Sequence, residues 1–505
     1  MSGKVYLVGA GPGDPGLVTQ KGIDCIAAAD VIIYDFLASK QLLSFTAEKA
    51  ERIYAGKQGG DHTLTQDRIN ALIVEKALAG NTVVRLKGGD PFIFGRGGEE
   101  IEALVAENIS FEIVPGVTSA IAAPAYAGIP LTHRQYTSSV TFITGHEDPD
   151  KTESLINWEA IANTGGTLVF LMGVKNLARI TERLTKHGMD PAMPAALVRW
   201  GTTTTQQTVT GTLATINEDV AKAGLTAPCI IVIGQVVTLR EKMKWFENRT
   251  LFGKRIVVTR ARKQASDMVK KLSDLGAECL EVPVIRIRVP DDTTLLDQAI
   301  ATIQKYDWLI FTSVNGVDVF FSRMDAMGKD TRALGHVKTS AIGPATADRM
   351  RANGLNADIV PESFRAESVV TAFEKLDMAG EKVLLPRAAG ARPVLPVELV
   401  KMGATVDEII AYTAVSETTE TAPLVEGLRE KTIDMVTFTS SSTVTNFKAL
   451  LPSDEFEDLI SGITIAAIGP ITADTARENG FHVNVTADTY TIDGLCEAIV
   501  NYYES

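Results

Sequence analysis

Short apolar runs alternate with amphipathic stretches along this 505-residue chain, and this pattern predicts an α/β fold throughout. Residues 5–8 and 31–34 are rich in β-branched side chains and predict strands, whereas apolar spacing over residues 17–29 predicts a helix between them. Alternating strands and helices form sheets whose faces are covered by helices. The densest apolar stretch, residues 229–237, is half the length that spans a bilayer, so we expect no transmembrane segment.

The clearest boundary between domains is the charged stretch over residues 240–253, which separates two apolar strands. We predict a first half over residues 1–245, with lobes of about 1–113 and 114–245, a linker over 246–253, and a second half over 254–505. At about 150 residues per domain, the length of the chain favours roughly three to four domains.

The second half contains an internal repeat. Residues 311–320 recur as 438–447 and residues 341–347 recur as 467–473, at offsets of 127 and 126 residues. Each copy predicts a strand, a Thr/Ser turn, a helix, a strand, a Gly-Pro turn and a helix, so we expect two similar facing α/β domains. The Thr and Ser hydroxyls at these turns either cap helices or face a shared ligand cleft.

Composition and charge exclude several classes of function. The net charge is −13, which argues against nonspecific binding to nucleic acids or membranes. Four cysteines lack C-x-x-C spacing and six histidines show no ligand spacing, so we expect buried thiols and no metal site. The chain begins without a signal-peptide apolar region, and we expect a cytoplasmic protein.

A glycine-rich turn over residues 9–14 follows the first predicted strand, and Asp35 ends the second. This arrangement resembles a dinucleotide-binding turn. Asp14, however, stands where the third glycine belongs, and Pro12 removes a backbone N–H that a phosphate would need. We therefore do not expect a nicotinamide or flavin cofactor.

Five ordered motifs, at residues 8–19, 84–100, 115–119, 128–134 and 141–146, resemble the signatures of the tetrapyrrole methylase family. Within this family the resemblance is strongest to uroporphyrinogen-III C-methyltransferases, over residues 1–245. It implies a two-lobed fold, S-adenosyl-L-methionine as methyl donor, two methylations of uroporphyrinogen III, at C-2 and C-7, to give precorrin-2, and a homodimer. The residues implied to contact the donor are Pro12, Gly88, Gly89, Asp90, Ile93, Thr118, Ser119, Met172 and Gly201.

The same resemblance implies catalytic roles for four charged residues. Asp35 and Lys57 match the family's base and acid, and Asp14 and Arg96 belong to the same cleft. A carboxylate at a strand end can accept the proton that the methylated tetrapyrrole must lose. Lys57 and Arg96 are also suited to binding the acetate and propionate groups of the substrate, Arg96 in a bidentate manner. For Asp35, a helix N-cap is the structural alternative.

Motifs at residues 257–260, 311–315, 341–346, 385–387 and 410–413 resemble the uroporphyrinogen-III synthase family. This resemblance implies two flavodoxin-like domains, domain A over about 254–286 and 412–505 and domain B over about 287–411, with chain crossings near 283–290 and 405–415. It implies cyclisation of hydroxymethylbilane to uroporphyrinogen III with inversion of ring D, without a metal or cofactor. Tyr412 matches the family's acid, unless it only packs at the junction. Residues expected to bind the substrate are Arg260, Thr312, Ser313, Thr346, Arg387, Ser440, Ser441 and Thr472.

Together the two resemblances predict a bifunctional enzyme of tetrapyrrole biosynthesis, on the route to sirohaem or cobalamin. Two alternatives remain open from the residues alone. The first half could methylate a different tetrapyrrole, and the second half could be a ligand-binding module without catalytic activity.

Overall fold

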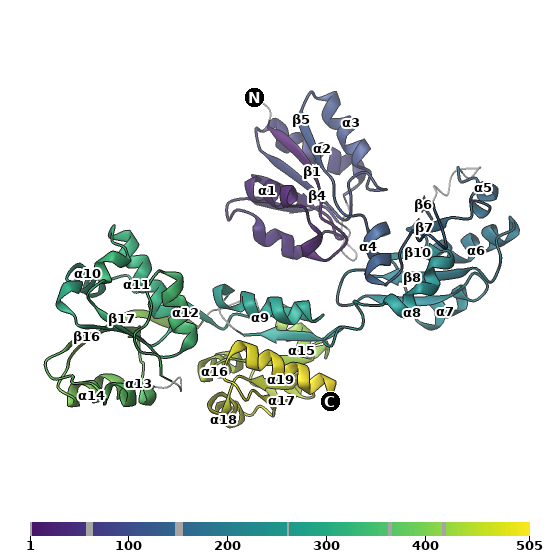
Figure 1. Ribbon diagram of the computed structural model, residues 1–505. Helices are drawn as coiled ribbons and strands as arrows, with labels where there is room; N and C mark the ends of the chain where they lie inside the picture. Colours follow the sequence, from purple (N-terminus) through teal and green to yellow (C-terminus); the bar gives the residue numbers. More distant parts are fainter. Residues whose placement is uncertain (1–2, 57–63, 147–154, 260–261, 362–365, 417–420) are drawn as a thin grey trace. The chain divides into compact units, whose positions relative to one another are not determined.

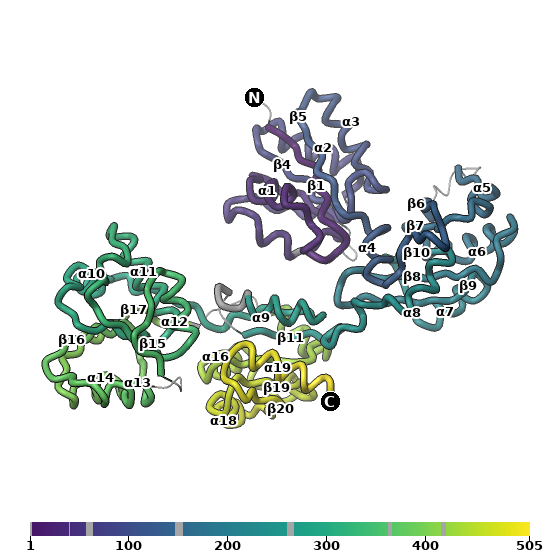
Figure 2. The backbone as a smooth tube through the Cα atoms, viewed as in Figure 1, coloured from purple at the N-terminus to yellow at the C-terminus, as the bar shows by residue number. Residues whose placement is uncertain are grey.

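A computed structural model of the chain describes residues 3–56, 64–146, 155–259, 262–361, 366–416 and 421–505 (Figures 1 and 2). These residues form four five-stranded sheets with helices on their faces, which confirms the predicted α/β class. The chain divides into two compact units with the main boundary between Lys254 and Arg255, and residues 272–278 pack with the first unit. Among the residues described, no helix combines the length and hydrophobicity that crossing a bilayer requires.

The first sheet is parallel in every strand pair, in the order β3-β2-β4-β1-β5. Alternate residues point to opposite faces: Leu7 and Ile33 pack against α2 and α3, whereas Ile32 and Leu86 pack against α1. The elements are β1 (Lys4–Gly9), α1 (Gln20–Ala28), β2 (Val31–Tyr34), β3 (Glu51–Tyr54), α2 (Gln66–Leu78), β4 (Val83–Lys87), α3 (Gly97–Ala106) and β5 (Ser110–Val114), with short 3-10 helices η1 (Pro15–Leu17) and η2 (Lys40–Phe45).

The second sheet is mixed, in the order β6-β7-β10-β8-β9, with only β6 and β7 parallel among its pairs. Helix α4 packs on one face, against Val169 and Val198, and helices α5, α6 and α7 cover the other. The elements are α4 (Ser119–Tyr126), β6 (Val140–Thr144), α5 (Trp158–Ala162), β7 (Thr167–Leu171), η3 (Val174–Asn176), α6 (Leu177–Lys186), β8 (Pro194–Arg199), β9 (Gln207–Thr212), α7 (Ile216–Lys222), β10 (Cys229–Ile233), η4 (Gln235–Leu239) and α8 (Arg240–Met243).

The segment over residues 246–253, predicted as a linker, contains two buried apolar side chains. Phe246 and Leu251 are 4% and 0% exposed, and Phe246 packs edge-on against Phe252. The Leu251 N–H donates to the Leu275 carbonyl at 3.0 Å. This segment is therefore packed, and it is not an extended tether.

The third sheet has the order β12-β11-β18-β19-β20. Numbered within its own domain, this order is the 2-1-3-4-5 arrangement of flavodoxin-like folds, as predicted for domain A. The elements are β11 (Arg255–Val258), α9 (Arg262–Asp274), β12 (Glu278–Glu281), α15 (Ala422–Arg429), β18 (Met435–Phe438), α16 (Ser441–Leu450), α17 (Phe456–Ile460), β19 (Thr464–Ala467), α18 (Pro470–Glu478), β20 (Val483–Thr486) and α19 (Ile492–Glu504).

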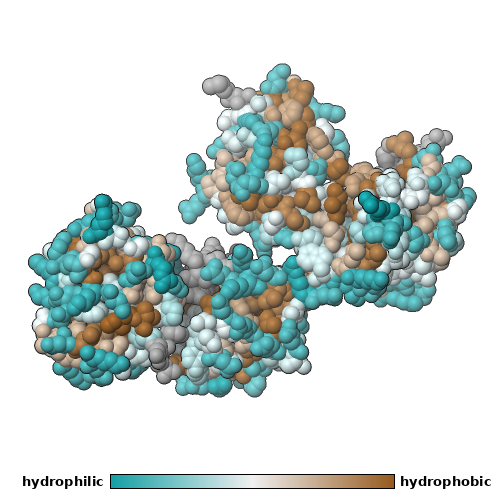
Figure 3. Space-filling model, in the orientation of Figure 1, coloured by the Kyte–Doolittle hydropathy of each residue, from teal (hydrophilic) through white to brown (hydrophobic). Residues whose placement is uncertain are grey.

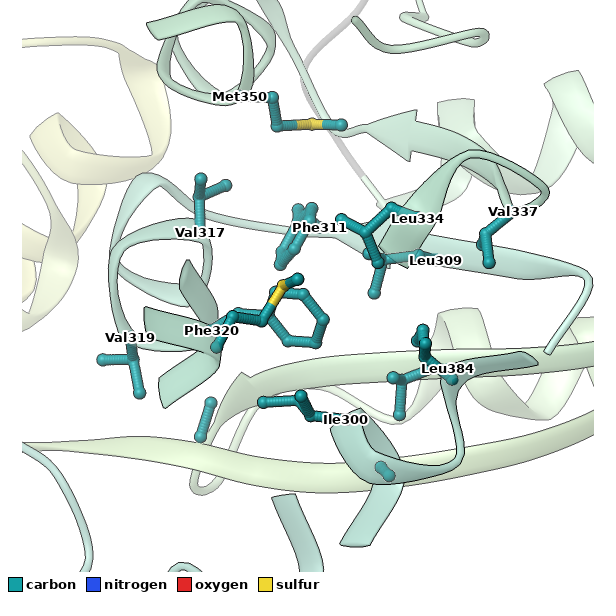
Figure 4. Close-up of a cluster of buried hydrophobic side chains, with 14 of the residues drawn as sticks. Ile300, Leu309, Phe311, Val317, Val319, Phe320, Leu334, Val337, Met350 and Leu384 are labelled. Carbon is teal, nitrogen blue, oxygen red and sulfur yellow. The ribbon is translucent and has the colours of Figure 1, made fainter. Parts of the chain in front are cut away.

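The fourth sheet, of domain B, has the order β13-β17-β16-β14-β15, with β13 antiparallel at its edge. Its core packs Phe311, Phe320 and Leu384 between the sheet and helices α10 to α12 (Figure 4). The elements are β13 (Ile285–Arg288), α10 (Thr294–Ala301), η5 (Ile303–Lys305), β14 (Trp308–Phe311), α11 (Val314–Ala326), η6 (Thr331–Leu334), β15 (Lys338–Ala341), α12 (Pro344–Ala352), α13 (Ala366–Phe373), β16 (Lys382–Ala388), α14 (Val394–Lys401) and β17 (Thr405–Ser416).

The repeat found in the sequence is confirmed in the order of the elements: β14–α11–β15–α12 and β18–α16–β19–α18 follow the same sequence, and the two strands of each copy pair in parallel. One crossing differs from the expectation. Strand β17 pairs with β16 as far as Tyr412 and then with β13 as far as Ser416. The chain thus leaves domain B after β17, and Tyr412 belongs to the sheet of domain B, not to domain A.

Candidate active sites

A cavity of about 830 Å³ lies in the first unit and brings together residues that are far apart in the sequence. Its volume is within the range of small-molecule sites, roughly 300–1,000 Å³. Eleven of the predicted site residues line it, and their individual roles stay predictions. They are Pro12, Asp35, Gly88, Gly89, Asp90, Ile93, Arg96, Thr118, Ser119, Met172 and Gly201.

Two glycine-rich loops form one wall of the cavity and are joined by their backbones. The Gly89 N–H donates to the Gly11 carbonyl at 2.7 Å, and the Gly11 N–H donates to the Gly89 carbonyl at 3.2 Å. Both residues have positive φ, 74° and 70°, a region that favours glycine. A Cβ at Gly9 would lie only 2.7 Å from the Gly89 carbonyl oxygen. The missing side chains therefore allow the loops to approach each other and leave backbone amides and carbonyls accessible to a ligand.

The carboxylate of Asp90 organises the turn that follows these glycines. One oxygen accepts the Phe92 N–H at 2.8 Å and the Ile93 N–H at 3.2 Å. The other accepts the Gly116 N–H at 3.0 Å, which connects the turn to the segment before α4. Asp90 thus fixes the loop geometry, and its remaining lone pairs can accept hydroxyl groups of a bound ribose.

Helix α4 begins at the cavity, where Thr118 is its N-cap and accepts the Ala120 N–H at 3.3 Å. The first amides of a helix lack intrahelical partners and point toward ligands at its N-terminus. On other sides of the cavity, Met172 is 52% exposed and Ile93 37% exposed. The cavity therefore combines hydrogen-bonding backbone with apolar surface, a combination typical of small-molecule sites.

Asp35 lies at the end of β2 and lines the cavity with its carboxylate partly exposed. One oxygen accepts the Leu37 N–H at 3.1 Å, so it holds a turn and does not cap a helix. The other accepts Nη2 of Arg85 at 3.3 Å. Arg96, also on the cavity wall, has a left-handed backbone and pairs with the exposed Glu99 at 2.6 Å. Because that pair is exposed, its guanidinium can exchange partners at low cost.

Several polar residues of the cavity wall were missed from the sequence, among them Gln66, Arg85 and Lys87. Arg85 and Lys87 are 3% and 4% exposed although both are charged. Burial lowers the pKa of Lys87, and the positive charge of Arg85 lowers it further. Two cations at alternate positions of the otherwise apolar strand β4 were a signal in the sequence, since buried charges require partners.

Asp14 is adjacent to the cavity loops but is not among the residues that line the described cavity. Its carboxylate accepts the Gly16 N–H at 2.7 Å, as the cap of η1, and the Tyr126 hydroxyl at 2.7 Å. Burial and this hydrogen bond raise the pKa of Tyr126. Asp14 therefore has a clear structural role, and its predicted catalytic role is untested. Lys57, the predicted acid, lies outside the described residues.

In domain B, the predicted acid Tyr412 and the predicted substrate residue Ser313 are in contact. The Tyr412 hydroxyl donates to Oγ of Ser313 at 2.9 Å, and Tyr412 is 6% exposed. Ser313 is also the N-cap of α11, where Oγ accepts the Gly316 N–H at 3.0 Å. Thr312 is the neighbouring residue, between β14 and this cap.

The remaining predicted residues of the second half are largely engaged in the structure. Ser440 caps α16 in a capping box with Thr443, and Ser441 shares a hydrogen bond with Thr475 at 2.8 Å. Thr346 and Thr472 are 4% and 6% exposed. Arg387, 5% exposed, donates from Nη2 to the Arg392 carbonyl at 2.8 Å. Their predicted contacts with substrate stay predictions, and Arg260 lies outside the described residues.

Within the described residues, no group of three or more His, Cys, Asp or Glu side chains is arranged to hold a metal ion. On the visible surface of each part, hydrophilic and hydrophobic residues are interspersed (Figure 3).

Comparison with known proteins separates the same two halves. The family model for tetrapyrrole (corrin/porphyrin) methylases matches residues 4–217, and that for uroporphyrinogen-III synthase HemD matches residues 266–497. The porphyrin biosynthesis protein HemD of Ruminiclostridium josui is 37% identical over 99% of this chain and 98% of its own length.

Two further relatives resemble the first half alone. The S-adenosyl-L-methionine-dependent uroporphyrinogen III methyltransferase of Methanosarcina barkeri is 56% identical over 47% of this chain and 94% of its own length. A crystal structure of uroporphyrin-III C-methyl transferase from Thermus thermophilus, complexed with S-adenyl homocysteine, is 36% identical over 47% of this chain and all of its own, with a TM-score of 0.41. The chain belongs to the family of tetrapyrrole-biosynthesis enzymes that join an S-adenosylmethionine-dependent methylase to a uroporphyrinogen-III synthase.

Proposed function

We propose that this chain converts hydroxymethylbilane to precorrin-2 in two reactions. The second half closes the linear tetrapyrrole with inversion of ring D, and the first half methylates the resulting uroporphyrinogen III at C-2 and C-7. The observation that carries the methylase assignment is the convergence of eleven predicted residues, from Pro12 to Gly201, on one cavity.

The cavity fits S-adenosylmethionine, which supplies an electrophilic methyl group on its sulfonium. The glycine loops leave the backbone exposed to the adenosyl group, and the Thr118 cap orients the start of α4 toward it. Holding donor and acceptor in line contributes more to such a transfer than any covalent intermediate. Asp35 then accepts the proton that the methylated ring loses, and Arg96 binds a substrate carboxylate.

In the second half, Tyr412 donates a hydrogen bond or proton to the hydroxyl that leaves hydroxymethylbilane. A phenol O–H can donate a hydrogen bond or a proton in this way. Its contact with Ser313 supports the proposal, because a fixed hydroxyl can be aimed at one position of the substrate. Ring closure follows departure of water and requires no further reactant.

We further propose that the enzyme acts in the cytoplasm, where its four free cysteines remain reduced, and that it forms a homodimer through the methylase half. Light scattering of the purified chain tests the second point: a mass twice that of the chain is expected, and a monomer contradicts it.

The test supplies the full chain anaerobically with hydroxymethylbilane, with and without S-adenosylmethionine, and identifies products by mass and isomer. Type III uroporphyrinogen without the donor, and a doubly methylated product with it, are expected. Formation of only the type I isomer, with added uroporphyrinogen III still methylated, would make the second half a binding module.

Two variants assign the reactions to the two halves. Asp35→Asn should lower methyl transfer by about 10²–10⁴-fold, the usual contribution of a general base, and leave ring closure unchanged. Tyr412→Phe should slow ring closure and leave methylation of added uroporphyrinogen III unchanged. Loss of both activities in either variant would indicate misfolding or a shared site and would contradict this division.

A further inference from the structure

Behind the polar wall of the methylase cavity lies a buried carboxylate that the proposed mechanism does not use. Glu100, in the first turn of α3, is 1% exposed and does not line the described cavity. Its Oε1 accepts Nζ of Lys87 at 2.8 Å, Nε of Arg85 at 3.1 Å and Nε2 of Gln66 at 3.3 Å. All three donors line the cavity, so a single buried oxygen holds three side chains of the cavity wall in place.

The alternation of strand β4 explains this arrangement. Val83, Arg85 and Lys87 point to one face of the first sheet, the face that α2 and α3 cover. Gln66 is the first residue of α2, and Glu100 belongs to α3. The cluster is thus formed where two helices begin above the carboxyl end of a central strand.

Arg85 connects this cluster to the proposed base. Its Nε bonds to Glu100, whereas its Nη2 bonds to Asp35 at 3.3 Å. Its Nη1 donates to the Leu86 carbonyl at 3.0 Å. Hydrogen bonds at all three nitrogens restrict the orientation of the guanidinium. Because the guanidinium is planar and rigid, this orientation also determines where Nη2 meets the Asp35 carboxylate.

The charges in the cluster depend on one another. Arg85 and Lys87 are two buried cations, and Glu100 and Asp35 are the carboxylates bonded to them. Removing one partner of a buried ion pair leaves an uncompensated charge, which the structure must relieve by rearranging. Without the charge of Glu100, Arg85 and Lys87 would compete for Asp35, and the orientation of its carboxylate would change.

We propose that Glu100 is a positioning residue for methyl transfer, acting through Arg85 on Asp35. The proposal rests on the proposed function of Asp35 as the base. It predicts that Glu100 supports the proton-transfer step and contributes little to the affinity for the methyl donor, because the hydrogen bonds of its carboxylate go to Lys87, Arg85 and Gln66 and not to the glycines.

A double-mutant cycle in the full chain tests this proposal. Glu100→Gln keeps the side-chain volume and removes the charge, and Glu102→Gln removes a charge from an exposed position of the same helix as the matched control. Anaerobic assays with uroporphyrinogen III give kcat and KM, and calorimetry gives the affinity for S-adenosylhomocysteine. We expect Glu100→Gln to lower kcat by about 10- to 100-fold, with KM and this affinity changed by less than about threefold, and Glu102→Gln to match the wild type.

The decisive comparison is made in the Asp35→Asn background. If Glu100 acts through Asp35, adding Glu100→Gln there should change kcat by less than about twofold, since residues that act as a unit are not additive. If the two losses multiply, Glu100 acts independently of Asp35 and the proposal is overturned. Should Glu100→Gln fail to fold, Arg85→Lys provides the second test, because a single ammonium cannot bridge both carboxylates and kcat should fall similarly.

The experiments distinguish a wrong assignment of Asp35 as the base from a wrong assignment of Glu100 as a positioning residue. If Asp35→Asn lowers kcat but neither Glu100→Gln nor Arg85→Lys does, only the positioning role is wrong. If Asp35→Asn leaves kcat unchanged, the proposed base is wrong and the coupling is overturned with it.

Discussion

Single buried side chains set several properties of this protein before any ligand binds. The thiols of Cys229 and Cys496 are 5% and 6% exposed, and burial raises the pKa of each from 9.0 to about 11. Cys229 also lines the methylase cavity, so its protonation state matters for the polarity of that wall. At neutral pH both groups are neutral thiols, and they behave as small apolar side chains.

These pKa values predict a pH dependence of stability. An unfolded thiol loses its proton near pH 9, whereas the folded thiol keeps it until about pH 11. The stability that the neutral thiols provide is therefore complete below pH 9 and is lost as the pH rises through 11, to the extent of about 3 kcal/mol per thiol. The thermal midpoints of the wild type and the Cys229→Ala/Cys496→Ala variant should therefore converge between pH 9 and 11. A constant difference over this range would mean that the thiols have ordinary pKa values.

Among the elements of the second half, the repeated Ser/Thr turns serve as helix caps in both domains. Ser440 and Ser313 occupy matching positions before α16 and α11 and accept backbone N–H groups of those helices. The two functions left open by the sequence, capping and ligand binding, can be separated by substitution. Glycine is tolerated at N-caps, whereas alanine is not.

Ser440→Ala should lower the free energy of unfolding of its domain by about 1 kcal/mol, and Ser440→Gly by only a few tenths. Denaturant unfolding followed by a domain-specific probe measures this difference. If the hydroxyl only caps the helix, ring closure in Ser440→Gly should equal that of the wild type. A loss of activity in Ser440→Gly, with stability retained, would instead assign the hydroxyl to substrate binding.

Elements and their repeat were predictable from the sequence because periodicity and local turn chemistry specify them. The strands near residues 5–8 and 31–34 and both copies of the repeat formed as predicted. Contacts over long sequence separations were not predictable. The bonds from Arg85 to Glu100 and Asp35 depend on how α3 and β2 pack around β4. The extent of β17 depends on its antiparallel partner β13, which no local pattern specifies.

Across the molecule, the segment that precedes Lys254 is part of the methylase half. Glu247 accepts Nε2 of Gln206 at 2.7 Å and also pairs with Arg240, which is 7% exposed. Gln206 in turn accepts the Thr202 N–H at 2.9 Å, and the Thr202 hydroxyl accepts the Asp14 N–H at 3.0 Å. This chain of hydrogen bonds extends from the junction to the loop beside the cavity.

Aromatic side chains also connect the junction to the loop beside the cavity. Tyr126, which donates to Asp14, lies edge-on to Trp245 and Phe246 with ring centroids 5.0 and 4.7 Å apart. The Trp245 indole N–H donates to the Ala125 carbonyl at 3.0 Å, at the end of α4. Thr118 caps α4 at the cavity, and Trp245 and Phe246 contact its last turn, so the helix is held at both ends.

The boundary of an independent methylase half should therefore lie after residue 254 and not after residue 239. A chain of residues 1–254 should bind S-adenosylhomocysteine within about threefold of the full protein, whereas residues 1–239 should bind it at least about tenfold more weakly. Removing residues 240–254 leaves Tyr126 without its ring partners and exposes apolar surface on α4, which destabilises the cavity wall. Calorimetry and thermal unfolding measure both effects. In the full chain, Glu247→Gln should lower the unfolding midpoint of the first unit, because it leaves the buried Arg240 without a charged partner. If the two truncated chains bind equally well and Glu247→Gln does not change the stability, residues 240–254 only connect the two halves.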